Sequence, residues 1–264
     1  IGITTTVDKS GNTAAIYLAG PLAGRDMIDN CRIYGSSATV RLSIGVWCAS
    51  DVIPTIRSNY ILSCSSYGVL LQNSTAGAGG EAVIMGNTFN TAVASPNGAS
   101  ALTYTSGLGV VRIIGNTFQT YDIGVDIQPD STVANSSALI SANSFENNNT
   151  ASILVDRVTS GGFVNTLNVT GNNFQNPTGK HVYIRDQTGT NGAFCRYINI
   201  TGNAHSFTAT GPIQFAGGYM ANIDGNIFEA MAVGLNAIGF SATAPGTGTI
   251  GTNVFAGMTT PYAL

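Results

Sequence analysis

The chain has 264 residues, enough to bury a sizeable core in one large all-β domain or in two average ones, and only 9% of them are charged. Average globular proteins carry a charge on about a quarter of their residues. The net charge of −3 leaves no basic footprint for a nucleic acid, and no apolar run approaches the roughly 18 residues of a membrane span. We therefore expect no nucleic-acid partner and no membrane insertion.

One motif recurs along the whole chain. It reads Gly-Asn-Thr-Phe in "VIMGNTFNT" (83–91) and "IIGNTFQT" (113–120), and its asparagine defines position zero of a repeat. Nine copies follow one another at intervals of 29, 28, 29, 27, 29, 31, 23 and 27 residues. The zero positions are Asn30, Asn59, Asn87, Asn116, Asn143, Asn172, Asn203, Asn226 and Asn253. A near-constant period of this length indicates a repeat architecture.

Each repeat predicts three short strands. Apolar residues at −5 and −3 alternate with polar ones, which is typical of a strand with one buried face. A second strand follows the asparagine and carries an aromatic residue at +2, which is Phe in six repeats and His205 in another. About ten residues later, a third strand carries two inward-facing residues. These pairs are Val69/Leu71, Val125/Ile127, Ile153/Val155, Val182/Ile184 and Ile213/Phe215.

A repeat of this size cannot bury its own apolar face, so we expect the repeats to stack. Each strand should pair in parallel with its counterpart one coil along, at roughly 4.8 Å. Parallel crossovers are right-handed in nearly all cases. The sequence therefore predicts an all-β fold, a right-handed, single-stranded parallel β-helix (solenoid) of about nine coils. We expect residues 1–264 to form one such domain, with repeats from about 27 to 255, as a fragment of a longer chain.

The recurring side chains have structural explanations in such a fold. Asn tolerates the left-handed conformation of a tight turn, and stacked carboxamides can hydrogen-bond from coil to coil. We therefore expect the zero-position asparagines to sit at turns, in one line along the rod. The +2 aromatic residues, with His205, should form a stack in the core. The four cysteines lack C-x-x-C spacing, and we expect buried free thiols.

These repeats resemble the pectate-lyase-like right-handed parallel β-helix superfamily, in which an I-x-x-N-x-F unit is followed by a "GVDIQ"-type strand. The resemblance covers about residues 27–255. The activity motifs of pectate lyases and polygalacturonases are missing. In "VIPTIRS", for example, Val52 stands where a pectate lyase has its first Arg. The charge-poor texture is more similar to the β-helical shaft of a phage tailspike.

The similarity to tailspikes implies a function and a partner. It implies an extracellular protein of the virion, on the phage tail, that binds or cleaves bacterial surface polysaccharide such as capsule or O-antigen. It also implies a homotrimer. Stretches such as "STAGAGGEA" (74–82) place small neutral side chains in outward positions, which favours close contact between identical chains.

The chain has only 13 acidic residues, and one group of them suggests a site. Glycoside hydrolysis needs two carboxyl groups, roughly 5 Å apart for retention and 6.5–9.5 Å apart for inversion. Three consecutive repeats place ionisable residues beside the third strand, in "YDIGVDIQPDS", "ILVDRV" and "KHVYIRD". We expect catalytic carboxyl groups at Asp126, Asp156 and Asp186. The expected substrate-binding residues are Asp122, Arg157, His181, Tyr183 and Arg185.

The same residues also have a structural interpretation. When the strands are aligned, Asp156 falls beside Arg185. Arg157 likewise falls beside Asp186, so the alignment predicts two crossed ion pairs between coils. Four functions stay open: a glycoside hydrolase, a polysaccharide lyase, a non-catalytic carbohydrate-binding or adhesin rod, and a purely structural trimeric shaft. We expect no cofactor and no metal, because no zinc, phosphate-loop or nucleophile-elbow pattern occurs.

Overall fold

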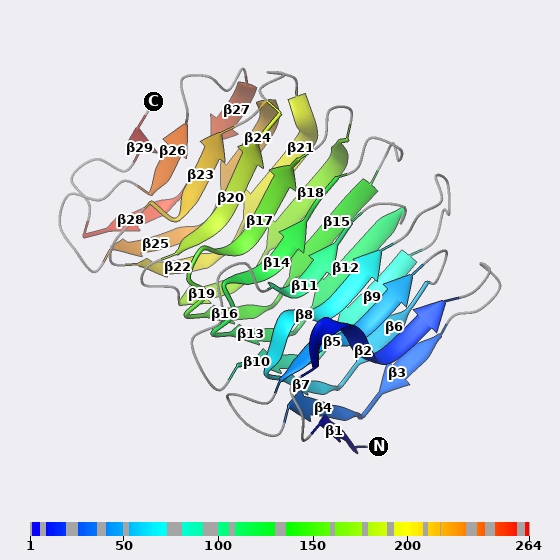
Figure 1. The fold of residues 1–264 in the computed structure, drawn as a ribbon. Helices are drawn as coiled ribbons and strands as arrows, with labels where there is room; N and C mark the ends of the chain where they lie inside the picture. Colours follow the sequence, from blue (N-terminus) through cyan, green and yellow to red (C-terminus); the bar gives the residue numbers. More distant parts are fainter. Residues whose placement is uncertain are drawn as a thin grey trace.

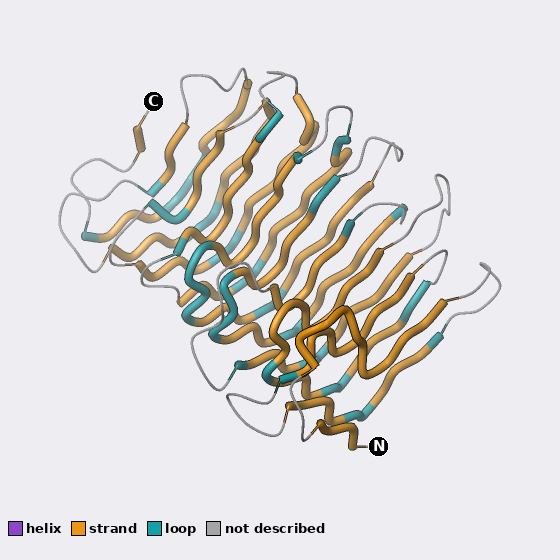
Figure 2. The backbone as a smooth tube through the Cα atoms, viewed as in Figure 1, coloured by secondary structure: helices purple, strands orange, loops and turns teal. Residues whose placement is uncertain are grey.

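Among the residues that it describes, the computed structural model contains 29 strands and no helix (Figure 1). The described residues are 2–5, 9–19, 26–35, 41–49, 53–72, 81–91, 100–105, 109–129, 136–158, 162–175, 179–188, 193–207, 211–216, 218–230, 237–240, 246–257 and 262–263. Strands β1 and β29 lie at opposite ends of the molecule (Figure 1). Figure 2 shows the strands between them lying side by side along its whole length.

The strands form three parallel sheets, which we call A, B and C. Sheet A contains β1 (Gly2–Thr5), β4 (Arg32–Gly35), β7 (Tyr60–Leu62), β10 (Thr88–Asn90), β13 (Thr117–Gln119), β16 (Ser144–Glu146), β19 (Asn173–Gln175), β22 (Ala204–Phe207), β25 (Ile227–Ala230) and β28 (Val254–Ala256). Sheet B contains β2 (Lys9–Ala19), β5 (Leu42–Ala49), β8 (Cys64–Gln72), β11 (Ser100–Tyr104), β14 (Ile123–Ile127), β17 (Ala151–Arg157), β20 (Lys180–Asp186), β23 (Ile213–Ala216), β26 (Ile238–Phe240) and β29 (Tyr262–Ala263). Sheet C contains β3 (Met27–Asp29), β6 (Thr55–Arg57), β9 (Glu81–Met85), β12 (Val110–Ile114), β15 (Ser136–Ser141), β18 (Val164–Thr170), β21 (Ala193–Thr201), β24 (Gly218–Asp224) and β27 (Gly246–Ile250).

The coils follow directly from this order. Strands β3 to β29 divide into nine successive triplets, each with one strand in sheet C, one in sheet A and one in sheet B. Among the described strands, each pairs with its counterparts in the coils before and after it and with no other strand. The prediction of an all-β, parallel β-helix of about nine coils is confirmed.

The interior is a continuous apolar core that runs from coil to coil. The five inward pairs predicted on the third strand are all at most 1% exposed. The +2 aromatic residues form a stack with ring centroids 4.6–5.2 Å apart and interplanar angles of 7–15°. The stack consists of Phe89, Phe118, Phe145, Phe174, His205, Phe228 and Phe255. The predicted core stack, His205 included, is therefore confirmed.

Small residues on sheet B make room for these rings. A Cβ atom added to Gly124 would lie 2.6 Å from the carbonyl oxygen of Ser152 and 2.9 Å from Cδ1 of Phe145. Gly68, two coils earlier, has the same kinds of neighbour. Real Cβ atoms essentially never approach so closely, so the phenyl stack and the next coil together require glycine at these positions.

An asparagine ladder satisfies the backbone at one corner of the coils. The backbone N–H of Asn143 donates to Oδ1 of Asn172 at 3.0 Å, and its Nδ2 donates to the same oxygen at 2.9 Å. Its Nδ2 also donates to the carbonyl of Ile113 at 2.9 Å. Its own Oδ1 accepts the two equivalent bonds from Asn116. The ladder runs through Asn59, Asn87, Asn116, Asn143, Asn172, Asn203, Asn226 and Asn253.

The structure corrects two predictions about this corner. Cys31, not Asn30, occupies the first ladder position, because the backbone N–H of Cys31 donates to Oδ1 of Asn59 at 2.9 Å. From Cys31 to Asn226, the left-handed conformation belongs to the residue before the ladder position, for example Asn30 (φ 55°) and Gly115 (φ 65°), and not to the ladder residue itself. The ladder asparagine is therefore explained by its carboxamide and not by turn conformation.

All four cysteines are free, as predicted, although Cys31 is only partly buried while Cys48, Cys64 and Cys195 are buried. Within the described part of the chain, no helix is long and apolar enough to cross a membrane.

Candidate functional site

The predicted acidic group lies mainly on the outer face of β14, β17 and β20 in sheet B. The register places Asp126 beside Leu154 and Leu154 beside Tyr183. It also places Asp156 beside Arg185, as predicted by aligning the third strands of consecutive repeats. The strand pairing therefore brings residues from three repeats into one patch.

Both predicted ion pairs are present. Nε of Arg185 donates to Oδ1 of Asp156 at 3.0 Å, and the second nitrogen of the guanidinium bonds to the other carboxylate oxygen. Arg157 binds Asp186 in the same two-pronged manner, with an Nε to Oδ1 distance of 3.0 Å. Burial alone would raise the pKa of Asp186, but hydrogen bonds from Arg157 and Thr188 hold that pKa below its usual value. Each guanidinium group therefore binds both oxygen atoms of its partner carboxylate, Asp156 or Asp186. A general base or a nucleophile would need one of these oxygens to be free.

Asp126 differs from the other two carboxyl groups. It is 3% exposed, Gln128 donates to its Oδ2 at 2.6 Å, and its Oδ1 has no hydrogen-bond partner among the residues that the structure describes. Burial raises the pKa of Asp126 to about 7, with a further increase from the Asp156 carboxylate and an opposing effect of the Gln128 bond. A carboxyl group that keeps its proton near neutral pH has the protonation state of a general acid.

Tyr183 lies two strands from Asp126, with Leu154 between them, and forms part of a second, outward apolar cluster. It packs against Ile123, Ala151 and Leu154, which are at most 8% exposed. Nζ of Lys180 lies 4.5 Å from the centre of the Tyr183 ring, within the range of a cation–π contact. The ring is therefore already engaged by apolar side chains and by a cation.

Two predicted substrate-binding residues lie apart from the outer patch. His181 is 0% exposed and lies in the interior, where its Nδ1 is 3.0 Å from Nδ1 of His205 and its ring stacks on Phe174. Asp122 precedes β14, is 8% exposed, and accepts a hydrogen bond from Oγ1 of Thr150 at 3.0 Å. Neither residue presents a free polar group on the outer face of the patch.

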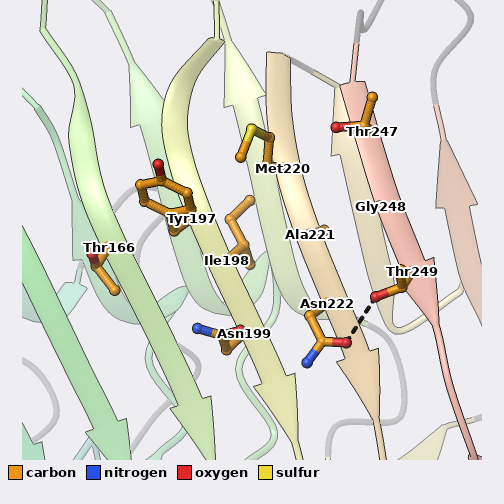
Figure 3. Close-up of a pocket in the computed structure, with 10 residues that line it drawn as sticks. All are labelled: Thr166, Tyr197, Ile198, Asn199, Met220, Ala221, Asn222, Thr247, Gly248 and Thr249. Carbon is orange, nitrogen blue, oxygen red and sulfur yellow. Dashed lines mark hydrogen bonds between the residues drawn. The ribbon is translucent and has the colours of Figure 1, made fainter.

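An open groove lies on a different surface, the outer face of sheet C (Figure 3). It has a volume of about 560 Å³ and crosses β18, β21, β24 and β27. Two large side chains stand exposed in it, Tyr197 at 52% and Met220 at 44%. The lining residues are Thr166, Tyr197, Ile198, Asn199, Met220, Ala221, Asn222, Thr247, Gly248 and Thr249.

Carboxamides and hydroxyls line the groove in pairs. Nδ2 of Asn199 donates to Oδ1 of Asn168 at 2.8 Å. At the other side, Oγ1 of Thr249 donates to Oδ1 of Asn222 at 2.9 Å, the bond drawn in Figure 3. Among the described residues that line the groove, none has a carboxylate or a cationic side chain. An exposed aromatic ring beside uncharged donors and acceptors suits a ligand with both apolar faces and hydroxyl groups.

The sequence did not single out this groove, although the repeat contains the signal. Its residues fall at positions −6 and −4 of consecutive repeats, on the strand face opposite the core. Those at −6 are Thr166, Tyr197, Met220 and Thr247, and those at −4 are Asn199, Asn222 and Thr249. An aromatic residue at −6 and two asparagines at −4, on the same outward face, were the only indication.

Metal ligands do not cluster in the described residues, where no group of three or more His, Cys, Asp or Glu side chains could hold an ion. In comparisons with known proteins, the chain matches no family model, no curated protein and no solved structure. The β-helix itself is thus shown by the coordinates, while the similarity to particular β-helix families rests on the repeat.

Proposed function

We propose that this β-helix recognises a polysaccharide along the outer face of sheet C. The observation that supports the proposal is the open groove, in which the exposed Tyr197 lies beside carboxamides and hydroxyls from successive coils. Sugar rings have apolar faces that stack on aromatic rings and hydroxyl edges that bind amides. Tyrosine offers a large, rigid contact area at low entropic cost.

The repeat geometry suits a polymer. Successive strands lie roughly 4.8 Å apart, so a chain that runs across the strands meets equivalent positions at each coil. Along the −4 positions these are Asn199, Asn222 and Thr249, all able to bind hydroxyl groups. A small molecule would use only part of this row.

The ligand that we propose is a bacterial surface polysaccharide, such as a capsule or an O-antigen. The charge-poor repeats resemble those of phage tailspikes, and this resemblance supports the choice of ligand, an extracellular location on the phage tail, and a homotrimer. These three points are proposals about the whole protein.

Titration calorimetry with capsular and O-antigen polysaccharides tests the proposal. We expect Tyr197→Ala to weaken binding by about tenfold, the equivalent of roughly 1.4 kcal/mol. The matched control is Tyr60→Ala, which removes another partly exposed tyrosine from sheet A, 36% exposed. Equal affinities of the wild type and Tyr197→Ala for a bound polysaccharide would contradict the proposed site.

Hydrolysis at the sheet B patch is a second candidate, favoured by one observation. Burial raises the pKa of Asp126 to about 7, as a general acid requires. If the protein shortens the polysaccharide, Asp126→Asn should abolish the shortening. Asp156→Asn should do so only if Asp156 serves as the base and not merely as the partner of Arg185. If the polymer stays intact after prolonged incubation with the wild type, hydrolysis is excluded and binding without cleavage remains.

A further inference from the structure

We propose that the groove selects an uncharged glycan, because one sugar hydroxyl bridges Asn199 and Asn222. This inference rests on the proposed function and specifies its substrate class. It starts from the two strands at the middle of the groove, β21 and β24, where the register pairs Asn199 directly with Asn222. Their side chains leave the sheet on the same face, roughly 4.8 Å apart.

The orientation of both carboxamides is set by hydrogen bonds that lead away from each other. Asn199 directs its Nδ2 to Asn168 on β18. Asn222 directs its Oδ1 to Thr249 on β27. Figure 3 shows this arrangement, with the Asn199 nitrogen pointing away from Asn222 and the Asn222 oxygen pointing toward Thr249.

A spare acceptor and a spare donor remain between the two strands. Among the described residues, no hydrogen bond joins Asn199 to Asn222, and none occupies Oδ1 of Asn199 or Nδ2 of Asn222. A hydroxyl group can donate to the first atom and accept from the second at the same time. This complementary pair lies at the centre of the groove, between the hydrogen bonds that lead to Asn168 and to Thr249.

A carboxylate or sulfate at the same place would be disfavoured. Such a group has no proton to donate to Oδ1 of Asn199, so two acceptors would face each other. The lining residues that the structure describes include no cation to offset the loss of water around an anion. Arg196, the nearest arginine in sequence, stacks on Phe163 with its guanidinium carbon 4.6 Å from the ring centre.

The apolar part of the sugar also has a place. Tyr197 precedes Asn199 by two residues, so both side chains lie on one face of β21, roughly 7 Å apart along the strand. Met220 has the same relation to Asn222 on β24, and both large side chains line the groove. A pyranose ring that contacts Tyr197 or Met220 can therefore place a hydroxyl between the two carboxamides.

The test compares uncharged and acidic polysaccharides on the intact chain. The uncharged probes are mannan, dextran and galactan, and the acidic probes are polygalacturonate, alginate and hyaluronan. We expect binding to at least one uncharged probe and none to the acidic probes. Asn222→Asp keeps the acceptor for Thr249 but replaces the spare donor with an anionic oxygen. The loss of one hydrogen bond corresponds to about a 2- to 10-fold change in affinity. We therefore expect Asn222→Asp to bind an uncharged probe at least about 2-fold more weakly than the wild type does.

Asn173→Ala is the control, because it removes an exposed asparagine from sheet A, and it should leave binding unchanged. Preferential binding of an acidic probe, or an unchanged affinity of Asn222→Asp for an uncharged probe, would overturn this inference and leave polysaccharide recognition standing. Failure of every probe and of bacterial surface polysaccharides to bind would instead overturn the proposed function itself.

Discussion

Replacing Asp126 by Asn should stabilise the protein at neutral and alkaline pH. The carboxyl group is 3% exposed, and burial raises its pKa from 3.8 to about 7. Between these values the folded protein retains a proton that the unfolded chain releases, so the stability of the wild type falls as the pH rises from about 4 to about 7. Each pKa unit corresponds to about 1.36 kcal/mol, so the cost above pH 7 is about 4 kcal/mol.

Urea unfolding of the wild type and Asp126→Asn, followed by circular dichroism at about pH 4 and pH 8, measures this cost. The comparison cancels the titration of all other groups. Near pH 4 the two proteins should have similar free energies of unfolding, because a neutral carboxyl group and a carboxamide are alike in size and polarity. At pH 8 the variant should be more stable by up to about 4 kcal/mol. A difference that does not change with pH would refute the reasoning.

Other substitutions test the coil itself. Asn143→Ala should cost at least about 3 kcal/mol, because it strands buried groups on both neighbouring coils at roughly 1–3 kcal/mol each. The control Asn173→Ala should change the free energy of unfolding by less than about 0.5 kcal/mol. If urea unfolding gave equal costs for Asn143→Ala and Asn173→Ala, the stabilising role of the ladder would be contradicted. Gly124→Ala should cost about 1–3 kcal/mol, since the added methyl group meets a carbonyl oxygen at 2.6 Å, and an unchanged stability would exclude that clash. Burial lowers the pKa of His205 well below 6.5 in the folded protein. As the pH falls below about 6.5, the unfolded chain therefore binds a proton at this residue before the folded protein does, and the wild type loses stability. His205→Phe should reduce this loss between pH 7 and pH 5 in thermal melts, whatever its effect at pH 7; parallel curves would contradict it.

The fold could be predicted because one coil repeats nine times. Each copy of the motif places its apolar residues in the same register, so errors in one repeat are corrected by the others. The first copy shows the limit of this approach. "IDNCRI" contains an asparagine one residue before the ladder position, and only the hydrogen bond from Cys31 to Asn59 shows which residue aligns.

The ion pairs on sheet B could also be predicted, because they depend only on register. Arg157 and Arg185 each face an aspartate one coil away. The burial of Asp126 and His181 could not be predicted in this way. His181 immediately precedes Val182, and both are 0% exposed, so simple alternation does not hold at this point of the strand.

The groove escaped prediction for a different reason. Ligand binding in the groove depends on which outward strand faces are exposed to solvent. The pattern of the repeat does not predict that exposure. The outer faces of β14 and β17 are buried, whereas Tyr197 on β21 is 52% exposed. A polar residue in an outward register is therefore a candidate for ligand binding only where the structure leaves the face open.

Side-chain carboxamide resonances offer the most direct test of polysaccharide recognition on sheet C. The measurement is a nitrogen-15 NMR titration of the chain with a polysaccharide fragment that it binds. The account predicts that the carboxamide signals of Asn199 and Asn222 shift as binding saturates, while those of Asn90 and Asn173 on sheet A stay in place. Saturation with no shift at Asn199 and Asn222, or with shifts confined to residues around Tyr183 on sheet B, would contradict it.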